Sequence, residues 1–384
     1  MAYNRKQRLN DNIKAIETAF ILDREQRTPT ARERLLLERY CGFGGLKCIL
    51  NPARELADAV HWAKSDLELF APTVELHRLI RENSKNESEY KQLMDSLKQS
   101  VLTAFYTPSA VTEALTDVLK EHQIIPEKVL EPSAGIGAFV DSVLDNNPKA
   151  DIMAFEKDLL TGKILRHLHP EQKVRIEGFE KIEKPFNDYF DLAISNIPFG
   201  DVAVFDPSYT AMKGMRALVT RRIHNYFFVK ALDTVRDGGL VAFITSQGVL
   251  NAKNNSAARF MMLYHADLVS AIRLPNNLFT ENANTEVGSD LIILQKNSQK
   301  ESLRGDDNLL DTVYNDENRI PTNNYFLEHP ERIIHTTAKL DTDPFGKPAM
   351  IYTHEDGVEG IAEDLRKMLH EDFKKNLNLN RYLG

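Results

Sequence analysis

Seven short apolar runs between residues 128 and 295, separated by stretches of helical spacing, constrain most strongly how this chain can fold. Several runs are apolar throughout instead of alternating with polar residues, which is typical of strands covered on both faces. Strands that alternate with helices favour parallel pairing through right-handed crossovers. The sequence therefore predicts an α/β fold with a doubly wound, mostly parallel, seven-stranded sheet. The predicted strands are Lys128–Pro132, Asp151–Glu156, Lys173–Glu177, Asp191–Ser195, Leu240–Thr245, Leu268–Arg273 and Leu291–Gln295.

The segment before the sheet predicts an N-terminal helical domain over residues 1–100. Apolar residues follow helical spacing over Asp11–Glu25, and Thr30 and Glu33 form a capping box that opens a second helix. Residues 73–102 predict another long helical stretch with a polar middle. The glycines of residues 41–45 predict a plain turn, because no Lys-Ser/Thr pair follows them. Since this domain carries no chemical constellation, we expect it to contact a partner or DNA and to take no part in catalysis.

Residues 101–300 then form the predicted central domain, and residues 301–384 a C-terminal extension. Residues 301–318 are acidic and polar and predict a loop. The remainder predicts a strand–turn segment around residues 345–348 and a final helix over about residues 358–375.

Composition and charge exclude several classes of protein. The net charge of −8 argues against a protein that coats nucleic acid non-specifically, although a local basic surface could still bind DNA. No apolar run approaches the roughly 20 residues that span a bilayer, and the polar start has no apolar core of a signal peptide. The two cysteines are too few for a zinc site or a disulfide framework. We therefore predict no metal site, no membrane partner and a cytoplasmic location.

A glycine-containing loop follows the first predicted strand and opens a helix, as Glu131-Pro132-Ser133-Ala134-Gly135-Ile136-Gly137. Its small residues let the backbone approach a ligand, and the helix start offers free N–H groups. Glu156 ends the next strand, where a carboxylate can accept hydrogen bonds from both hydroxyls of a ribose. A dinucleotide site would carry a third glycine where Val140 stands. The loop indicates an adenosine-containing cofactor, and a tight strand–helix turn is the alternative.

Asn196-Ile197-Pro198-Phe199 follows the fourth predicted strand, at the edge where such sheets bind ligands. An amino nitrogen conjugated to a purine is a poor nucleophile unless acceptors for its two hydrogens turn its lone pair out of the ring. The side-chain oxygen of Asn196 and the carbonyl of Ile197 can supply both acceptors. Pro198 keeps Ile197 extended, and Phe199 offers a face for an unstacked base. The alternative is a strand-ending turn.

Phe105-Tyr106-Thr107-Pro108, just before a helix, completes a recognisable order of motifs. Together with the glycine loop, Glu156 and the Asn196 motif, it resembles the amino-group (N6-adenine) DNA methyltransferases. Within them it is similar to type I modification subunits and to the methylase portion of methylase–helicase proteins of bacterial mobile elements. The resemblance is specific over about residues 101–300 and implies a bacterial protein with a Rossmann-like methyltransferase domain.

This resemblance implies a role for each motif residue. Tyr106, Thr107 and Pro108 would line the methionine end of S-adenosyl-L-methionine, and Glu156 would bind its ribose. Asn196, Ile197, Pro198 and Phe199 would hold a flipped adenine for direct in-line transfer. The remaining cofactor-binding residues would be Glu131, Pro132, Ser133, Ala134, Gly135, Gly137 and Phe179.

The chain departs from the family pattern in three places. Ile197 replaces the usual first proline of the catalytic motif. Gly178 and Phe179 stand where the family often has an aspartate for the cofactor adenine, so the choice between Glu177 and Glu180 stays open. Only about 85 residues follow the last predicted strand, too few for a large target-recognition domain. We therefore expect DNA and a target-recognition or helicase subunit or domain as partners.

Basic residues follow the catalytic motif without an acid between residues 207 and 232. A phosphate backbone would pass there, so we predict DNA contact, and a solvated loop and helix face is the equally weighted alternative. The predicted contact residues are Lys213, Arg216, Arg221 and Arg222.

Three functional hypotheses follow from these motifs. The first is methyl transfer to the exocyclic amino group of adenine in DNA, in a restriction–modification or mobile-element system. The second is amino-group methylation of RNA or protein, which uses the same logic at the Asn196 motif. The third is a catalytically silent, cofactor-binding scaffold of a larger complex. The absence of a cysteine near the motif argues against methylation of a cytosine ring carbon.

Overall fold

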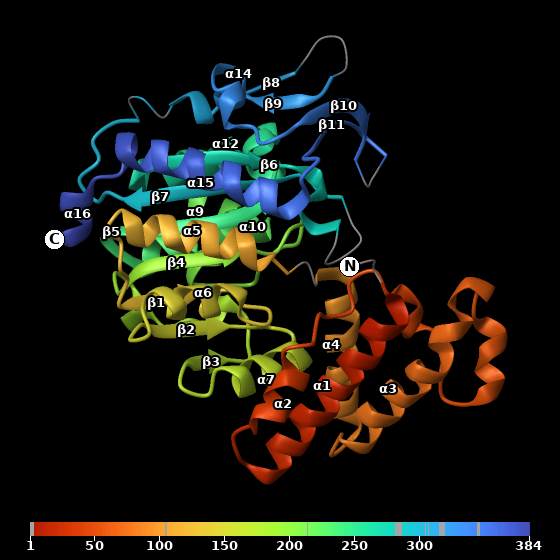
Figure 1. Ribbon diagram of the computed structural model, residues 1–384. Coiled ribbons are helices and arrows are strands. Elements are labelled where there is room, and N and C mark those ends of the chain that lie inside the picture. The colour runs from red at the N-terminus through yellow and green to blue at the C-terminus, as the bar shows by residue number, and fades with distance from the viewer. Residues whose placement is uncertain are drawn as a thin grey trace.

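The computed structural model describes residues 4–103, 106–212, 214–280, 286–303, 305, 307–314, 319–343 and 346–384. A twisted sheet with helices on both faces forms the larger part of the molecule, and four N-terminal helices lie beside the β3 edge of that sheet (Figure 1). Among these residues, no helix is long and apolar enough to cross a membrane.

The seven predicted strands form one sheet, in the order β3-β2-β1-β4-β5-β7-β6. β7 runs antiparallel to both of its neighbours, and the other pairs are parallel. This arrangement confirms the predicted α/β class and the mostly parallel pairing. The strands are β1 Lys128–Glu131, β2 Asp151–Phe155, β3 Lys173–Arg175, β4 Phe190–Asn196, β5 Val235–Ser246, β6 Ala266–Leu274 and β7 Ser289–Lys296.

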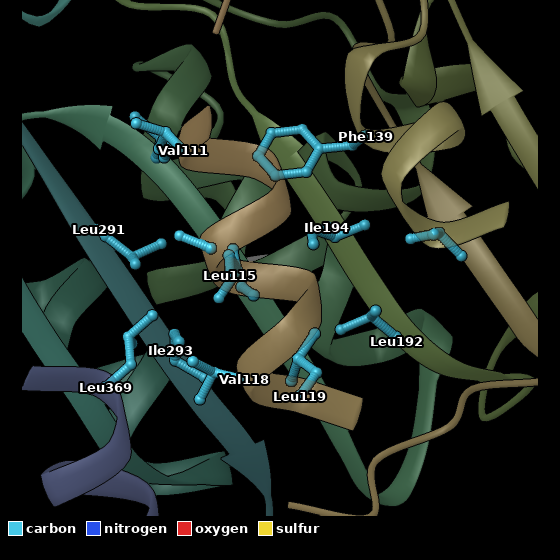
Figure 2. Packing of buried hydrophobic residues seen from close by; sticks show 14 of the residues in the cluster. Val111, Leu115, Val118, Leu119, Phe139, Leu192, Ile194, Leu291, Ile293 and Leu369 are labelled. Atoms are coloured by element: carbon cyan, nitrogen blue, oxygen red, sulfur yellow. The ribbon is translucent and has the colours of Figure 1, made fainter. Parts of the chain in front are cut away.

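Helices cover one face of the sheet with a continuous apolar core. α5 (Ser109–Glu121), α6 (Ala138–Asn146) and the final helix α15 (Gly357–Asn376) supply buried side chains to it. Figure 2 shows the side chains of α5 between those of β4, β7 and α15, and Leu115 and Ile194 belong to the same buried cluster. The final helix forms as predicted, and it contributes to the core of the central sheet.

A second core with many aromatic side chains lies on the opposite face. α10 (Ile223–Thr234) and α12 (Ser256–His265) cover that face, and Phe228 meets Phe243 of β5 at 5.2 Å between ring centroids. Short helices fill the connections, and they are α8 Pro207–Thr210, α9 Met215–Val219, α11 Gly248–Asn251, α14 Asn324–Glu328 and α16 Leu379–Leu383.

The N-terminal helices are α1 (Arg5–Glu25), α2 (Ala31–Leu37), α3 (Phe70–Glu82) and α4 (Glu87–Thr103). They enclose a third core, which they share with α7 (Leu159–Leu168) through Leu160, Ile164 and Leu168. The capping box of Thr30 and Glu33 forms as predicted.

The helical stretch predicted over residues 73–102 forms as two helices, α3 and α4, because the polar run of residues 83–86 in its middle separates them. Ser84 donates its hydroxyl to the Ile80 carbonyl, and Asn86 accepts from the Glu89 N–H at 2.9 Å. Side chains of this kind compete with helical hydrogen bonds and cap the next helix instead.

The chain after β7 forms two small hairpins. β8 (Thr312–Tyr314) pairs with β9 (Pro321–Asn323), so the loop predicted over residues 301–318 contains a short strand. β10 (Thr337–Thr342) pairs with β11 (Pro348–Thr353) around the predicted turn, of which residues 344 and 345 lie outside the described part.

Candidate active site

A cavity of about 550 Å³ opens at the carboxyl ends of β1, β2 and β4. Parallel strands deliver their ends to one edge of the sheet, which is why motifs far apart in sequence meet here. The predicted site residues that line it are Tyr106, Thr107, Pro132, Ser133, Ala134, Gly135, Glu156, Phe179, Asn196, Ile197, Pro198 and Phe199. Pro108 lines a smaller neighbouring cavity of about 340 Å³, and Phe105 lies outside the described residues.

The glycine loop folds tightly over the end of β1. Gly135 has a φ of 55°, and its N–H donates to Glu156 Oε2 at 2.8 Å. A Cβ at Gly135 would lie 2.8 Å from the Tyr106 ring, so the site requires glycine for both backbone conformation and space. Gly137 has a φ of 94°, and a Cβ there would meet His169 and Leu165. Gly137 does not line the cavity, so its smallness serves helix packing.

Two carboxyl groups lie at the glycine loop: Glu156 is half-buried and lines the cavity, and Glu131 is buried and does not line it. Glu156 accepts the Asp158 N–H at 2.7 Å through Oε1 and the Gly135 N–H through Oε2. Burial, together with the negative charge of Asp158, raises the pKa of Glu156 to about 8. Glu131 is 1% exposed below the loop, and burial raises its pKa to about 8 as well.

Unsatisfied buried polar atoms mark this region as one that receives a polar ligand. Within the described part of the chain, both carboxylate oxygens of Glu131 and the Thr107 hydroxyl lack a hydrogen-bond partner of normal geometry. Leaving such groups unpaired costs free energy. Thr107 lines the cavity, whereas Glu131 is buried and does not line it. A polar ligand against Thr107 would offset part of that cost, so the lining fits an S-adenosyl-L-methionine site.

The pKa of Glu156 gives a pH prediction for cofactor binding. Two ribose hydroxyls donate best to the carboxylate, which forms as the pH rises through about 8. Affinity for 5′-methylthioadenosine, which is uncharged in this range, should therefore rise by up to about tenfold per pH unit from pH 6 to 8 and level off above. Calorimetry at several pH values measures this slope. A flat or falling affinity in the wild type, or the same slope in Glu156→Gln, would contradict it.

The second motif is anchored at the end of β4, where Asn196 is half-buried beside Ile244 of β5. The Ile197 N–H donates to the Ile244 carbonyl at 3.0 Å, and the Ile197 side chain is buried in the second core. A proline at this position would have no N–H to donate. The departure from the usual motif therefore adds a hydrogen bond that fixes the backbone. Phe199 lines the cavity and meets Phe279 at 6.5 Å between ring centroids.

The two acids that flank Gly178 and Phe179, Glu177 and Glu180, have different surroundings in the structure. Phe179 is 1% exposed and its ring packs on Phe155 and Phe227, so its side chain belongs to the core. Glu177 pairs with Arg175 at 2.5 Å. Glu177 and Glu180 both line the cavity. The Glu180 carboxylate also occupies the space in which a Cβ of Gly178 would stand, and it pairs with Lys157 at 3.8 Å.

The basic stretch after the motif is largely tied to acids that flank it. Arg216 forms two hydrogen bonds with Asp233, at 2.5 and 2.9 Å. Arg222 pairs with Asp201 at 3.1 Å and also donates to Asn254 and Asn255. These contacts favour a structural role for both arginines.

The sequence analysis of residues 207–232 missed Asp201 and Asp233, because both acids lie just outside this stretch. Arg221 is exposed, and its contact with DNA stays a prediction. Lys213 lies outside the described residues.

The sequence interpretation missed several residues of the cavity. Gln99 and Ser100 of α4 line it, so the N-terminal helices form part of its wall, contrary to the expectation that residues 1–100 stand apart from the site. Asp158 also lines it, and its place two residues after Glu156 at a helix start was an available signal. At the rim, Phe205 is 77% exposed, an unusual position for an aromatic ring.

Comparison with known proteins agrees with this geometry. The family model described as N-6 DNA methylase matches residues 88–351, which is more than half of the chain. The defense against restriction protein B of Escherichia phage P1 is 29% identical over 201 residues, covering 51% of this chain and 8% of that protein. The type II methyltransferase M.XamI of Xanthomonas campestris pv. amaranthicola is 25% identical over 173 residues, covering 42% and 33%.

The chain thus spans at most a third of the length of these two relatives. Among solved structures, a chain of a type I restriction–modification system is 14% identical with a TM-score of 0.44, covering 76% of this chain and 70% of that chain. The family match, together with the mostly parallel sheet and the two motifs at its carboxyl edge, identifies the protein: the chain belongs to the N-6 DNA methylase family.

Proposed function

We propose that this chain transfers a methyl group from S-adenosyl-L-methionine to the exocyclic amino group of adenine in DNA. One observation carries the proposal: a single cavity is lined by the glycine loop, by Glu156 and by the Asn196–Phe199 motif. Its volume of about 550 Å³ falls within the range of ligand pockets. Nucleoside analysis of methylated DNA tests the proposal.

The cofactor half of the cavity is formed by the loop after β1 and the ends of β2 and β3. Glu156 would accept the ribose hydroxyls, because each of its oxygens already holds one backbone N–H and retains a free lone pair. We assign Glu180 to the cofactor adenine, since its carboxylate fills the place of the missing side chain at Gly178. When bound, the cofactor supplies an electrophilic methyl group.

The substrate half is formed by the motif at the end of β4. The oxygen of Asn196 and the carbonyl of Ile197 would accept the two amino hydrogens of the target base, which turns the nitrogen lone pair out of the ring. Positive charge develops on that nitrogen during transfer, so these acceptors act most strongly in the transition state. Phe199 would stack on the extruded base.

The target-recognition function belongs in this proposal to another part of the parent protein or to a partner subunit. The relatives M.XamI and the phage protein are much longer than the matched segments. Amino-group methylation of RNA or protein is the second candidate, because the motif chemistry is shared. A silent scaffold is disfavoured by the anchored Asn196 and Ile197.

Substitution of Glu156 tests the cofactor half. Above pH 8, where Glu156 is a carboxylate, Glu156→Ala should weaken binding of S-adenosylhomocysteine by about 2–4 kcal/mol, because two charge-assisted hydrogen bonds are lost. Isothermal titration calorimetry measures this change. In the same titration Glu180→Gln should weaken binding more than Glu177→Gln, because the Glu177 carboxylate is already paired with Arg175. Wild-type affinity in Glu156→Ala would remove this residue from the site.

A further inference from the structure

A serine from the N-terminal helices lies beside the cofactor-binding turn. Ser96 of α4 is 5% exposed, and its hydroxyl donates to Asp158 Oδ1. The Ser96 oxygen in turn accepts the Leu160 N–H at 2.9 Å. Asp158 Oδ1 accepts the N–H groups of Leu160 at 3.0 Å and Thr161 at 3.1 Å. Ser96, which lies 62 positions before Asp158 in the sequence, therefore completes the N-terminal cap of α7.

The capped turn also orients Glu156. The Asp158 N–H donates to Glu156 Oε1 at 2.7 Å. Because Ser96 holds the Asp158 side chain, it also fixes the direction of this N–H donor. Gly135 supplies the matching donor to Oε2 at 2.8 Å. With one backbone N–H on each oxygen, the remaining lone pairs of Glu156 have a fixed direction. Movement of the Asp158 turn would release one of the two donors.

The Ser96 hydroxyl stabilises the charged form of Asp158. Asp158 is buried next to Glu156, and burial raises the pKa of Asp158. The Ser96 hydroxyl opposes that rise by donating to the charged form. Without the Ser96 hydroxyl, Asp158 and Glu156 would lie together in a poorly solvated turn, and the charged form of Asp158 would have one hydrogen-bond donor fewer.

A second hydrogen bond joins the same regions. The Tyr40 hydroxyl, which is buried, meets Thr161 Oγ1 at 3.1 Å, one turn into the α7 helix. Thr161 also lines the cavity, and the Tyr106 hydroxyl lies 3.5 Å from the same oxygen. The N-terminal helices thus hold the start of α7 from two sides.

We propose that Ser96 is a positioning residue of the cofactor site, through which the N-terminal helices set the orientation of Glu156 and hence cofactor affinity. This inference rests on the proposed role of Glu156 in binding the cofactor ribose. It assigns the helical region a part in cofactor binding, in addition to any contact that the region makes with DNA or a partner.

The test compares Ser96 variants of the full chain in calorimetric titration with S-adenosylhomocysteine. Ser96→Ala should weaken binding about tenfold or more, in line with the loss of a hydrogen bond to a charged group. Ser96→Thr keeps the hydroxyl and should restore most of the affinity. Thr73→Val is the matched control, because it removes a buried hydroxyl of α3 that donates to the Leu69 carbonyl and does not line the cavity. Its affinity should stay at the wild-type value.

A double substitution separates positioning from general destabilisation. In a Glu156→Gln background, Ser96→Ala should weaken binding little further if Ser96 acts through Glu156. Full additivity, or wild-type affinity in Ser96→Ala while Glu156→Gln is weakened, would overturn the inference. Wild-type affinity in Glu156→Gln would instead reject the proposed function of Glu156. If Ser96→Ala does not fold, Ser96→Cys keeps the volume with a poor donor and must show the weakened affinity.

Discussion

Asn196→Ala should lower methyl transfer about a hundredfold to a thousandfold, which is the typical loss for one preorganised group that stabilises developing charge. The fold should persist, because Asn196 is the last residue of β4 and the neighbouring Ile197 N–H keeps its bond to Ile244. Cofactor affinity should persist as well, because Glu156 and the glycine loop are untouched. Single-turnover transfer at saturating DNA measures the rate, and calorimetry measures the affinity.

Phe199→Ala provides the comparison for this result. It removes a stacking surface worth about 1–3 kcal/mol, so it should weaken capture of the target base more than it slows the transfer step. Asn196→Ala should therefore lower mainly the rate of methyl transfer, and Phe199→Ala should lower mainly the affinity for DNA. Transfer at the wild-type rate in Asn196→Ala would exclude the proposed chemistry at this motif.

Removal of residues 1–100 should abolish measurable cofactor binding. A fragment that begins at residue 101 exposes Leu160, Ile164 and Leu168, which the N-terminal helices bury. It also loses Ser96 and the cavity-lining Gln99 and Ser100. Exposed apolar surface of this kind promotes aggregation. Calorimetry for cofactor affinity and gel filtration for the monomer fraction measure the outcome.

A fragment that stayed monomeric and bound cofactor as tightly as the full chain would contradict this prediction. In that case the N-terminal helices would only contact a partner or DNA, as expected from the sequence. Removal of residues 1–3, which leaves the N-terminal cap of α1 at Asn4 in place, is the control and should leave affinity unchanged.

The sheet could be predicted from the sequence because its strands carry their own signal. Runs such as Leu291–Gln295 are apolar at nearly every position, and each of the seven predicted runs became a strand with bounds shifted by a few residues. The antiparallel direction of β7 depends on how distant segments meet, which no local pattern encodes. The polar middle of residues 73–102 was visible in the sequence, but the end of one helix and the start of the next at residues 83–86 could not be predicted, because helical spacing continues on both sides.

The motifs of the site could be predicted for a similar reason, since each is local. Glu156 and Asn196 stand at strand ends, and parallel strands bring such ends together. Contacts between distant segments could not be predicted. Ser96 and Asp158 are 62 positions apart, and the partner of Arg216, Asp233, lies just outside the basic stretch. The roles of the lining residues in binding and transfer remain predictions.

The most direct test of the central claim is the identity of the methylated nucleoside. The chain is incubated with cofactor labelled in its methyl group and with duplex DNA, RNA and protein in parallel, and the labelled DNA is digested to nucleosides for chromatography. Our account predicts label in N6-methyl-2′-deoxyadenosine, which should form about a hundredfold to a thousandfold more slowly in the Asn196→Ala variant under the same conditions. Label in a cytosine nucleoside, or in RNA or protein with the DNA unlabelled, would contradict it.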